Sequence, residues 1–209
     1  MTAGAVPALV ALSAAPAVRG SAGAVQYVAW AFSNIAVGDK GTNACVAGGA
    51  VPALVALSTV PDAARGVAAA LNNIINSDAG RAACVAAGAV PALVTLSNTP
   101  AVSGSADAAQ CIARALSNIA VGDEGSNACV GAAAVSALVE LSAELVVRES
   151  AVAAENVARA LINIAVSDAG KTACVSAGAH AALAELASAP AITANAVAAE
   201  WVSKALAGI

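Results

Sequence analysis

Charged residues are scarce in this sequence. Only 11% of its 209 residues are Asp, Glu, Lys or Arg, and nine basic against thirteen acidic residues leave a net charge of -4. Proteins that bind nucleic acid neutralise its phosphates with clustered Lys and Arg. The composition therefore argues against nucleic-acid binding. A surface with so little charge also favours self-association.

Residues that carry chemistry are equally sparse. His180 is the only His and stands where equivalent segments carry Val, and no nucleophile or acid pair is spaced to use it. There is no Gly-rich phosphate loop and no convincing strand. We expect no catalytic residue, no enzyme activity and no cofactor. A hydrolase or redox reaction at Cys111 or His180 is the alternative.

Four of the five Cys recur in Ala-Cys-Val triplets, at Cys45, Cys84, Cys129 and Cys174. Packed helices lie about 8 to 10 Å apart, whereas a disulfide needs Cα atoms within about 7 Å. A zinc site lacks a close Cys pair and a second His. We expect small buried thiols, no metal, and a reducing cytoplasmic or nuclear location; Cys111 has no periodic partner.

The hydrophobic fraction is 60%, which is high enough to suggest a membrane protein. The uncharged run from Ala82 to Ala106 is nevertheless interrupted by Pro91 and Pro100. Much of its apolar content is Ala, which contributes little to insertion. We predict no membrane span.

A fixed internal period organises the chain. The Leu residues of the Ala-Leu segments lie 45, 39, 45 and 45 residues apart, at Leu9, Leu54, Leu93, Leu138 and Leu183. Such a period predicts a single array. We place one solenoid over residues 1–209, with repeats at about 1–38, 39–77, 78–122, 123–167 and 168–209.

Each full repeat is predicted to contain three helices, and the third includes the most recognisable stretch. It spans residues 28–36 and returns at 67–75, 112–120, 157–165 and, altered, 202–209. Helical spacing puts Val28, Phe32 and Ile35 on one face, for the core. It puts Gln26, Trp30 and Asn34 on another, free to bind.

Proline and aspartate mark the predicted helix boundaries. Pro residues follow the second helix and are expected to open the next one, at Pro16, Pro61, Pro100 and Pro190. Asp residues follow the third helix and are expected to cap the first helix of the next repeat, at Asp39, Asp78, Asp123 and Asp168.

The two ends of the array have no obviously polar cap, and the first repeat lacks its opening helix. An uncapped solenoid leaves a stacking face in water. Contacts between terminal repeats that build a homo-oligomer are therefore expected.

The segments Gly-Ala-Val-Pro-Ala-Leu-Val and Trp-Ala-Phe-Ser-Asn-Ile-Ala together resemble the armadillo repeat family over essentially the whole chain. The resemblance implies an all-α, right-handed α-solenoid whose third helices line a concave groove for extended peptides. It implies that an Asn near the end of each third helix binds the peptide backbone, with a Trp one turn earlier forming side-chain pockets.

Carried over by position, the resemblance assigns backbone binding to Asn34, Asn73, Asn118 and Asn163, with Gly208 in the fifth copy. The Trp position holds Trp30, Ala69, Arg114, Arg159 and Lys204. Trp201 lies three residues before Lys204 and is out of register, so it is not counted as a groove Trp. The preceding positions Gln26 and Gln110 complete the peptide-binding set.

An amide side chain is suited to this role because it offers both a donor and an acceptor, whatever the peptide sequence. The alternative is that each Asn holds its own repeat by bonding a neighbouring backbone group.

The cations at the Trp position predict an acidic group on the ligand near the third and fourth repeats. The alternative is that Glu155 with Arg159, and Glu200 with Lys204, are ordinary pairs four residues apart on a helix. Arg114 faces Gln110 and is the better probe.

Two functions from different classes follow. The first is a module that binds an extended peptide or a disordered protein segment, without nucleic acid or membrane. The second is an engineered or excised scaffold that mainly stacks or self-associates through its uncapped ends.

Overall fold

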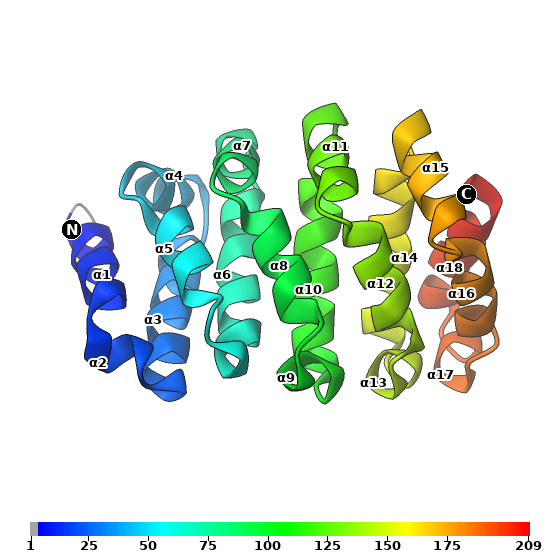
Figure 1. The fold of residues 1–209 in the computed structure, drawn as a ribbon, viewed down its shortest axis with the longest axis horizontal. Helices are drawn as coiled ribbons and strands as arrows, with labels where there is room; N and C mark the ends of the chain where they lie inside the picture. The colour runs from blue at the N-terminus through cyan, green and yellow to red at the C-terminus, as the bar shows by residue number, and fades with distance from the viewer. Residues whose placement is uncertain (1–3) are drawn as a thin grey trace.

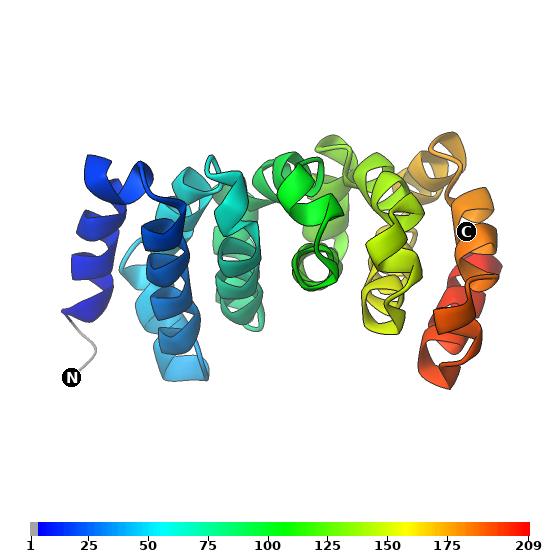
Figure 2. The same cartoon turned by 90° about the horizontal axis from the view of Figure 1, so that it is seen from below.

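The computed structural model describes residues 4–209, and within this range the chain is all-helical. Eighteen α-helices and one 3-10 helix stack in chain order along one axis, with the two termini at opposite ends (Figure 1). The same elongated succession of repeats is seen from below in Figure 2. The structure is thus an all-α solenoid.

The helices form parallel rows. The third helices, each packed against the next, are α3 (Ala22–Ile35), α6 (Ala64–Ile75), α10 (Ala106–Ile119), α14 (Ala151–Ile164) and α18 (Ala196–Gly208). The second helices, drawn in front of them in Figure 1, are α1 (Ala5–Ala14), α5 (Ala50–Leu57), α8 (Ala89–Ser97), α12 (Ala134–Ala143) and α16 (Ala179–Ala187). The first helices, along the top, are α4 (Asp39–Ala47), α7 (Asp78–Ala86), α11 (Asp123–Gly131) and α15 (Asp168–Ser176).

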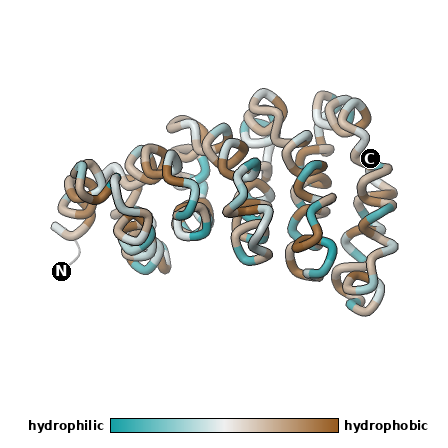
Figure 3. Tube along the Cα trace, turned by 60° about the horizontal axis from the view of Figure 1, so that its bottom comes forward, coloured by the Kyte–Doolittle hydropathy of each residue, from teal (hydrophilic) through white to brown (hydrophobic). Residues whose placement is uncertain are grey.

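The core lies between the rows and is continuous from repeat to repeat. Phe32 and its counterparts Leu71 and Leu116 are fully buried, and Val28 is 5% exposed, as predicted; Ile35 is only half-buried. Burial of a Leu or Phe side chain contributes about 1.5 to 3 kcal/mol. Hydrophobic and hydrophilic residues are interspersed along every repeat (Figure 3).

The prolines open the next helix, as predicted, but that helix is not the third one. Pro16, Pro100 and Pro190 do not open the third helix but a separate helix of four residues. These connecting helices are α2 (Pro16–Arg19), α9 (Pro100–Ser103), α13 (Leu145–Arg148) and α17 (Pro190–Thr193). A polar residue then caps the third helix; in α10, Ser105 Oγ accepts from the Ala108 amide at 3.3 Å.

The second repeat is shorter because it omits this arrangement. Its 3-10 helix, η1 (Pro61–Ala63), runs directly into α6 without a capping side chain. The interval of 39 rather than 45 residues therefore reflects one missing turn and its cap.

The predicted Asp caps are wrong. Each of these Asp residues is the first residue of its helix, and the residue before it occupies the cap position. Ser77 Oγ accepts from the Gly80 amide at 3.0 Å, and Ser167 Oγ accepts from the Gly170 amide at 3.0 Å. The Asp carboxylates instead interact favourably with the positive end of the helix dipole.

A Gly two residues after each Asp permits a close approach between helices. A Cβ built on Gly80 would lie 1.8 Å from the carbonyl oxygen of Ile74, and one on Gly41 would lie 1.7 Å from that of Ile35. The first helix therefore presses against the end of the preceding third helix, which only Gly allows.

The periodic Cys residues are free thiols with no exposed surface, which confirms the prediction that they pack as small apolar groups. Burial raises the pKa of the Cys84 and Cys129 thiols to about 12 and that of Cys174 to about 11. Cys111 is half-buried.

None of the helices in residues 4–209 is by itself long and apolar enough to cross a membrane. Two sharply bent pairs, α7 with α8 and α11 with α12, reach the required length and composition only together.

Candidate functional site

The outward side of the third-helix row is a line of polar side chains, which we call the ladder face. In α10 the residues spaced by four, Gln110, Arg114 and Asn118, are partly exposed, whereas Ala113 and Ala115 between them are buried. The helical period thus separates the core from a continuous surface that runs across all five third helices.

All ten side chains predicted to contact a peptide have exposed surface. The half-buried ones are Gln26, Asn73, Gln110, Arg114, Asn118, Arg159 and Asn163, and the exposed ones are Trp30, Asn34 and Lys204. The helices bring them together in one row, and none is buried beneath its neighbours.

Two of the Asn side chains bond to the repeat before them. Asn73 Nδ2 donates to the main-chain oxygen and to Oγ of Ser33, both at 3.0 Å. Asn163 Nδ2 donates to the same two atoms of Ser117, at 2.9 and 3.2 Å. A primary amide nitrogen carries two hydrogens, so both are used and Oδ1 is left to accept.

These bonds combine the two predicted roles of the Asn. The amide fastens neighbouring repeats together, rather than a repeat to itself as the alternative held. Only its acceptor half, instead of both halves, is available to a ligand.

The contact between the second and third repeats is built differently, because Asn72 of the second repeat stands at the position of Ser33 and Ser117. The Asn72 side chain is 3% exposed and lies between Arg114 and Asn118, with a bond of 2.8 Å to the Asn118 amide and contacts of 2.6 Å to Nε and Nη2 of Arg114. Sequence reasoning missed Asn72; the change from Ser to Asn at a repeated position was the available signal.

The other cations on the ladder face have carboxylate partners. Arg159 lies 3.4 Å from Glu155, and Lys204 lies 2.6 Å from Glu200. The hydrogen bond from Lys204 lowers the pKa of Glu200. Both ion pairs that the sequence offered as an alternative to ligand binding therefore form. Among residues 4–209, no carboxylate pairs with Arg114.

Aromatic side chains mark the two ends of the ladder face. Tyr27 and Trp30 form an edge-to-face pair with centroids 5.6 Å apart. Trp201 lies beneath both Arg159 and Lys204, each 4.9 Å from its ring. It occupies the position of Tyr27 in its repeat, so sequence register excluded it from the Trp position but missed its contact with two predicted site residues.

Two small clefts adjoin the ladder at equivalent places. One of about 230 Å³ includes Asn73 and Asp39, and one of about 150 Å³ includes Asn163 and Asp123. Their size suits a single side chain rather than a whole small-molecule ligand.

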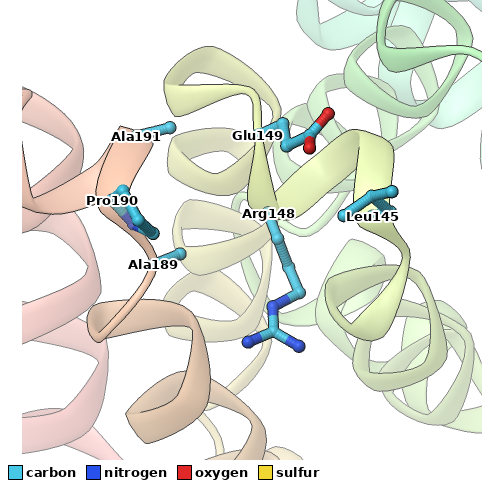
Figure 4. Close-up of a pocket in the computed structure, with 6 residues that line it drawn as sticks. All are labelled: Leu145, Arg148, Glu149, Ala189, Pro190 and Ala191. Carbon is cyan, nitrogen blue, oxygen red and sulfur yellow. The ribbon is translucent and has the colours of Figure 1, made fainter.

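A larger cavity, of about 560 Å³, lies elsewhere. Leu145 and Arg148 of the α13 region stand on one side of it and Ala189, Pro190 and Ala191 on the other (Figure 4). Its lining includes no residue of the ladder face.

Comparison with known proteins gives structural relatives only. No protein-family model matches the sequence, and no curated protein matches it. An engineered protein solved by crystallography is similar at 30% identity and a TM-score of 0.82, over 98% of this chain and 81% of that one.

Two further similar structures are described as armadillo repeat designs. A designed armadillo repeat protein in complex with the peptide (KR)4 shares 26% identity at a TM-score of 0.79, over 98% of this chain and 82% of that one. A computationally designed armadillo repeat protein for modular peptide recognition shares 26% identity at a TM-score of 0.81, over 99% and 82%.

Proposed function

We propose, from the similarity of this armadillo-like array to designed armadillo repeat proteins, that its ladder face binds an extended peptide or a disordered protein segment. The observation that carries the proposal is the pair of outward amide oxygens on Asn73 and Asn163, whose nitrogens are fixed by Ser33 and Ser117. An acceptor held in place from behind loses little freedom when a ligand N–H bonds to it.

The remaining residues of the set surround this pair. Asn34 and Asn118 extend the ladder, while Gln26 and Trp30 form an apolar subsite at one end. At the other end Gln110, Arg114, Arg159 and Lys204 contact ligand side chains. The set includes no catalytic group, and the proposed role is binding in a reducing intracellular compartment.

The charge of the ligand follows from the cations. One similar design is described in complex with the peptide (KR)4, which is basic. In this chain three of the five Trp-equivalent positions are Arg or Lys, and Arg114 has no carboxylate partner within residues 4–209, so it would repel such a ligand and attract a carboxylate. We propose an acidic segment for the third and fourth repeats.

Selection from a random dodecapeptide display library tests the proposal. The wild type is expected to enrich peptides, and the Asn73→Ala, Asn163→Ala double variant to bind the enriched peptides at least tenfold more weakly. The matched control replaces Asn43 and Asn127, which are exposed on the first helices α4 and α11, and should bind as the wild type does. Circular dichroism confirms that each variant is folded; equal losses in both double variants would contradict the proposal.

Self-association is the second candidate. Leu12 on α1 is 47% exposed and Val197 on α18 is 53% exposed, so both terminal helices present apolar side chains. Light scattering over a hundredfold dilution distinguishes the two: a mass that falls on dilution supports assembly, and a constant monomer mass removes it.

A further inference from the structure

The donors of Arg114 require the amide of Asn118 to be inverted relative to those of Asn73 and Asn163. A guanidinium group has donors and no acceptor, so the Asn72 oxygen must face Arg114, with contacts of 2.6 Å to Nε and Nη2. The Asn72 nitrogen then donates across the 2.8 Å contact to Asn118. Two amide nitrogens cannot share one hydrogen bond, so Asn118 turns its oxygen inward and its NH2 group outward.

The ladder therefore alternates in polarity. Asn73 and Asn163 present an oxygen because their nitrogens bond to Ser33 and Ser117. Asn118 presents a nitrogen because its partner is Asn72 instead of Ser. The chain Arg114 to Asn72 to Asn118 is buried at its centre, and the orientation of its amides is assigned from the donors and acceptors that face one another.

Arg114 supplies further donors beside the outward NH2 group. It precedes Asn118 by four residues on α10, so the two side chains lie on the same side of the helix. Its Nη1 group makes no hydrogen bond within residues 4–209, and no carboxylate pairs with it there. The bonds that Arg114 donates to the Asn72 oxygen hold the guanidinium in place without neutralising its charge.

We propose that Asn72 makes the third-repeat subsite selective for a carboxylate, bound by the NH2 group of Asn118 and by Arg114. The inference rests on the proposed peptide-binding function for its biological meaning. The carboxylate is either an Asp or Glu side chain or the C-terminus of the bound segment. A ligand donor placed between these two groups would face donors on both and be disfavoured.

The decisive variant is Asn72→Ser, which installs the residue found at the two equivalent positions 33 and 117. Asn118 should then bond to Ser in the way that Asn73 and Asn163 do, with its oxygen outward. The side chain of Arg114 is released at the same time. Because the chain already carries Ser at this place twice, the variant is expected to fold.

Acetate, as the carboxylate alone, provides a test that does not need a peptide. Nuclear magnetic resonance of the 15N-labelled protein should show a saturable shift of the Asn118 side-chain NH2 signal with acetate. An equal ionic strength of chloride should not reproduce it, and Asn72→Ser should abolish it. No response in the wild type, or the same response in the variant, would overturn the inference.

Peptides from the library then identify the source of the carboxylate. Two changes are made in the selected peptide: Glu or Asp is replaced by Gln or Asn, or the C-terminus is amidated. One of them is expected to weaken binding to the wild type about tenfold, as for loss of a charge-assisted bond. In Asn72→Ser the same change should cost twofold or less. Indifference of the wild type to both changes contradicts the inference. Failure to enrich any peptide would contradict the proposed peptide-binding function instead. The acetate titration would then still test whether the third-repeat subsite binds a carboxylate.

Discussion

Asn163 donates from its side-chain nitrogen to the main-chain oxygen of Ser117, 2.9 Å away in the preceding repeat. The last carbonyls of a helix have no partner within the helix, so this bond satisfies a group that would otherwise lack one. The residue that we propose to bind the ligand therefore also joins two repeats.

Replacement of Asn163 by Ala should lower the free energy of unfolding by about 1 to 3 kcal/mol, because it leaves that carbonyl unsatisfied. The exposed Asn127 on α11 serves as control, and its change to Ala should cost less than about 0.5 kcal/mol. Urea unfolding followed by circular dichroism measures both. Equal effects would mean that the bond contributes nothing.

Gly80 is expected to be irreplaceable. A Cβ at this position would lie 1.8 Å from the Ile74 oxygen, so Gly80→Ala should destabilise the array by about 3 kcal/mol or more, or prevent folding. At Gly131, in the last turn of α11, a Cβ meets no atom within 4 Å. Gly131→Ala should be neutral or stabilising by up to about 1 kcal/mol. Thermal melts measure both variants, and equal melting temperatures for Gly80→Ala and Gly131→Ala would contradict this account.

Stability should fall above pH 9 because of the buried thiols. The pKa of Cys84 and of Cys129 is about 12 in the folded chain, above that of an unfolded Cys, about 8.5. The unfolded state therefore loses protons first, and the stabilising effect of the neutral thiol, complete below pH 8.5, is lost as the pH rises toward 12. Urea midpoints between pH 8 and 10.5 should decline less in a Cys84→Ala, Cys129→Ala variant; parallel curves would refute the assignment.

Arg114 should confer salt-dependent affinity for acidic peptides. Arg114→Gln is expected to weaken a selected acidic peptide about tenfold and to flatten the dependence of Kd on NaCl, since an exposed charge interaction is screened by salt. Arg148→Gln, at the end of α13 away from the ladder face, is the control and should behave as the wild type. Titration calorimetry at 50 and 300 mM NaCl provides the comparison, and an unchanged salt slope in Arg114→Gln would count against the proposal.

The array and its core were predictable because they depend on periodic patterns. The recurrence of Leu54 and its counterparts, and of Cys45 and its counterparts, locates equivalent buried positions without any knowledge of the fold. Likewise, the four-residue spacing of Trp30 and Asn34 correctly indicates an outward face of α3.

The features that were not predicted are the helix caps, where two neighbouring residues have similar chemistry, and the side-chain contacts between repeats. Ser77 and Asp78 both favour a helix start, and only the backbone path decides that Ser77 caps and Asp78 begins the helix. The contact of Trp201 with Arg159 joins different repeats, and the polarity of Asn118 depends on Asn72, which is 46 residues away. Such pairs follow from the stacking distance between repeats, which a sequence pattern does not contain.

The most direct test of the central claim is a crystal structure of the chain with a library-selected peptide. The account predicts an extended peptide lying across α6, α10 and α14, with N–H groups bonded to Oδ1 of Asn73 and Asn163. A peptide bound in the α13–α17 cavity or on the second-helix row, with the ladder face uncovered, would contradict it.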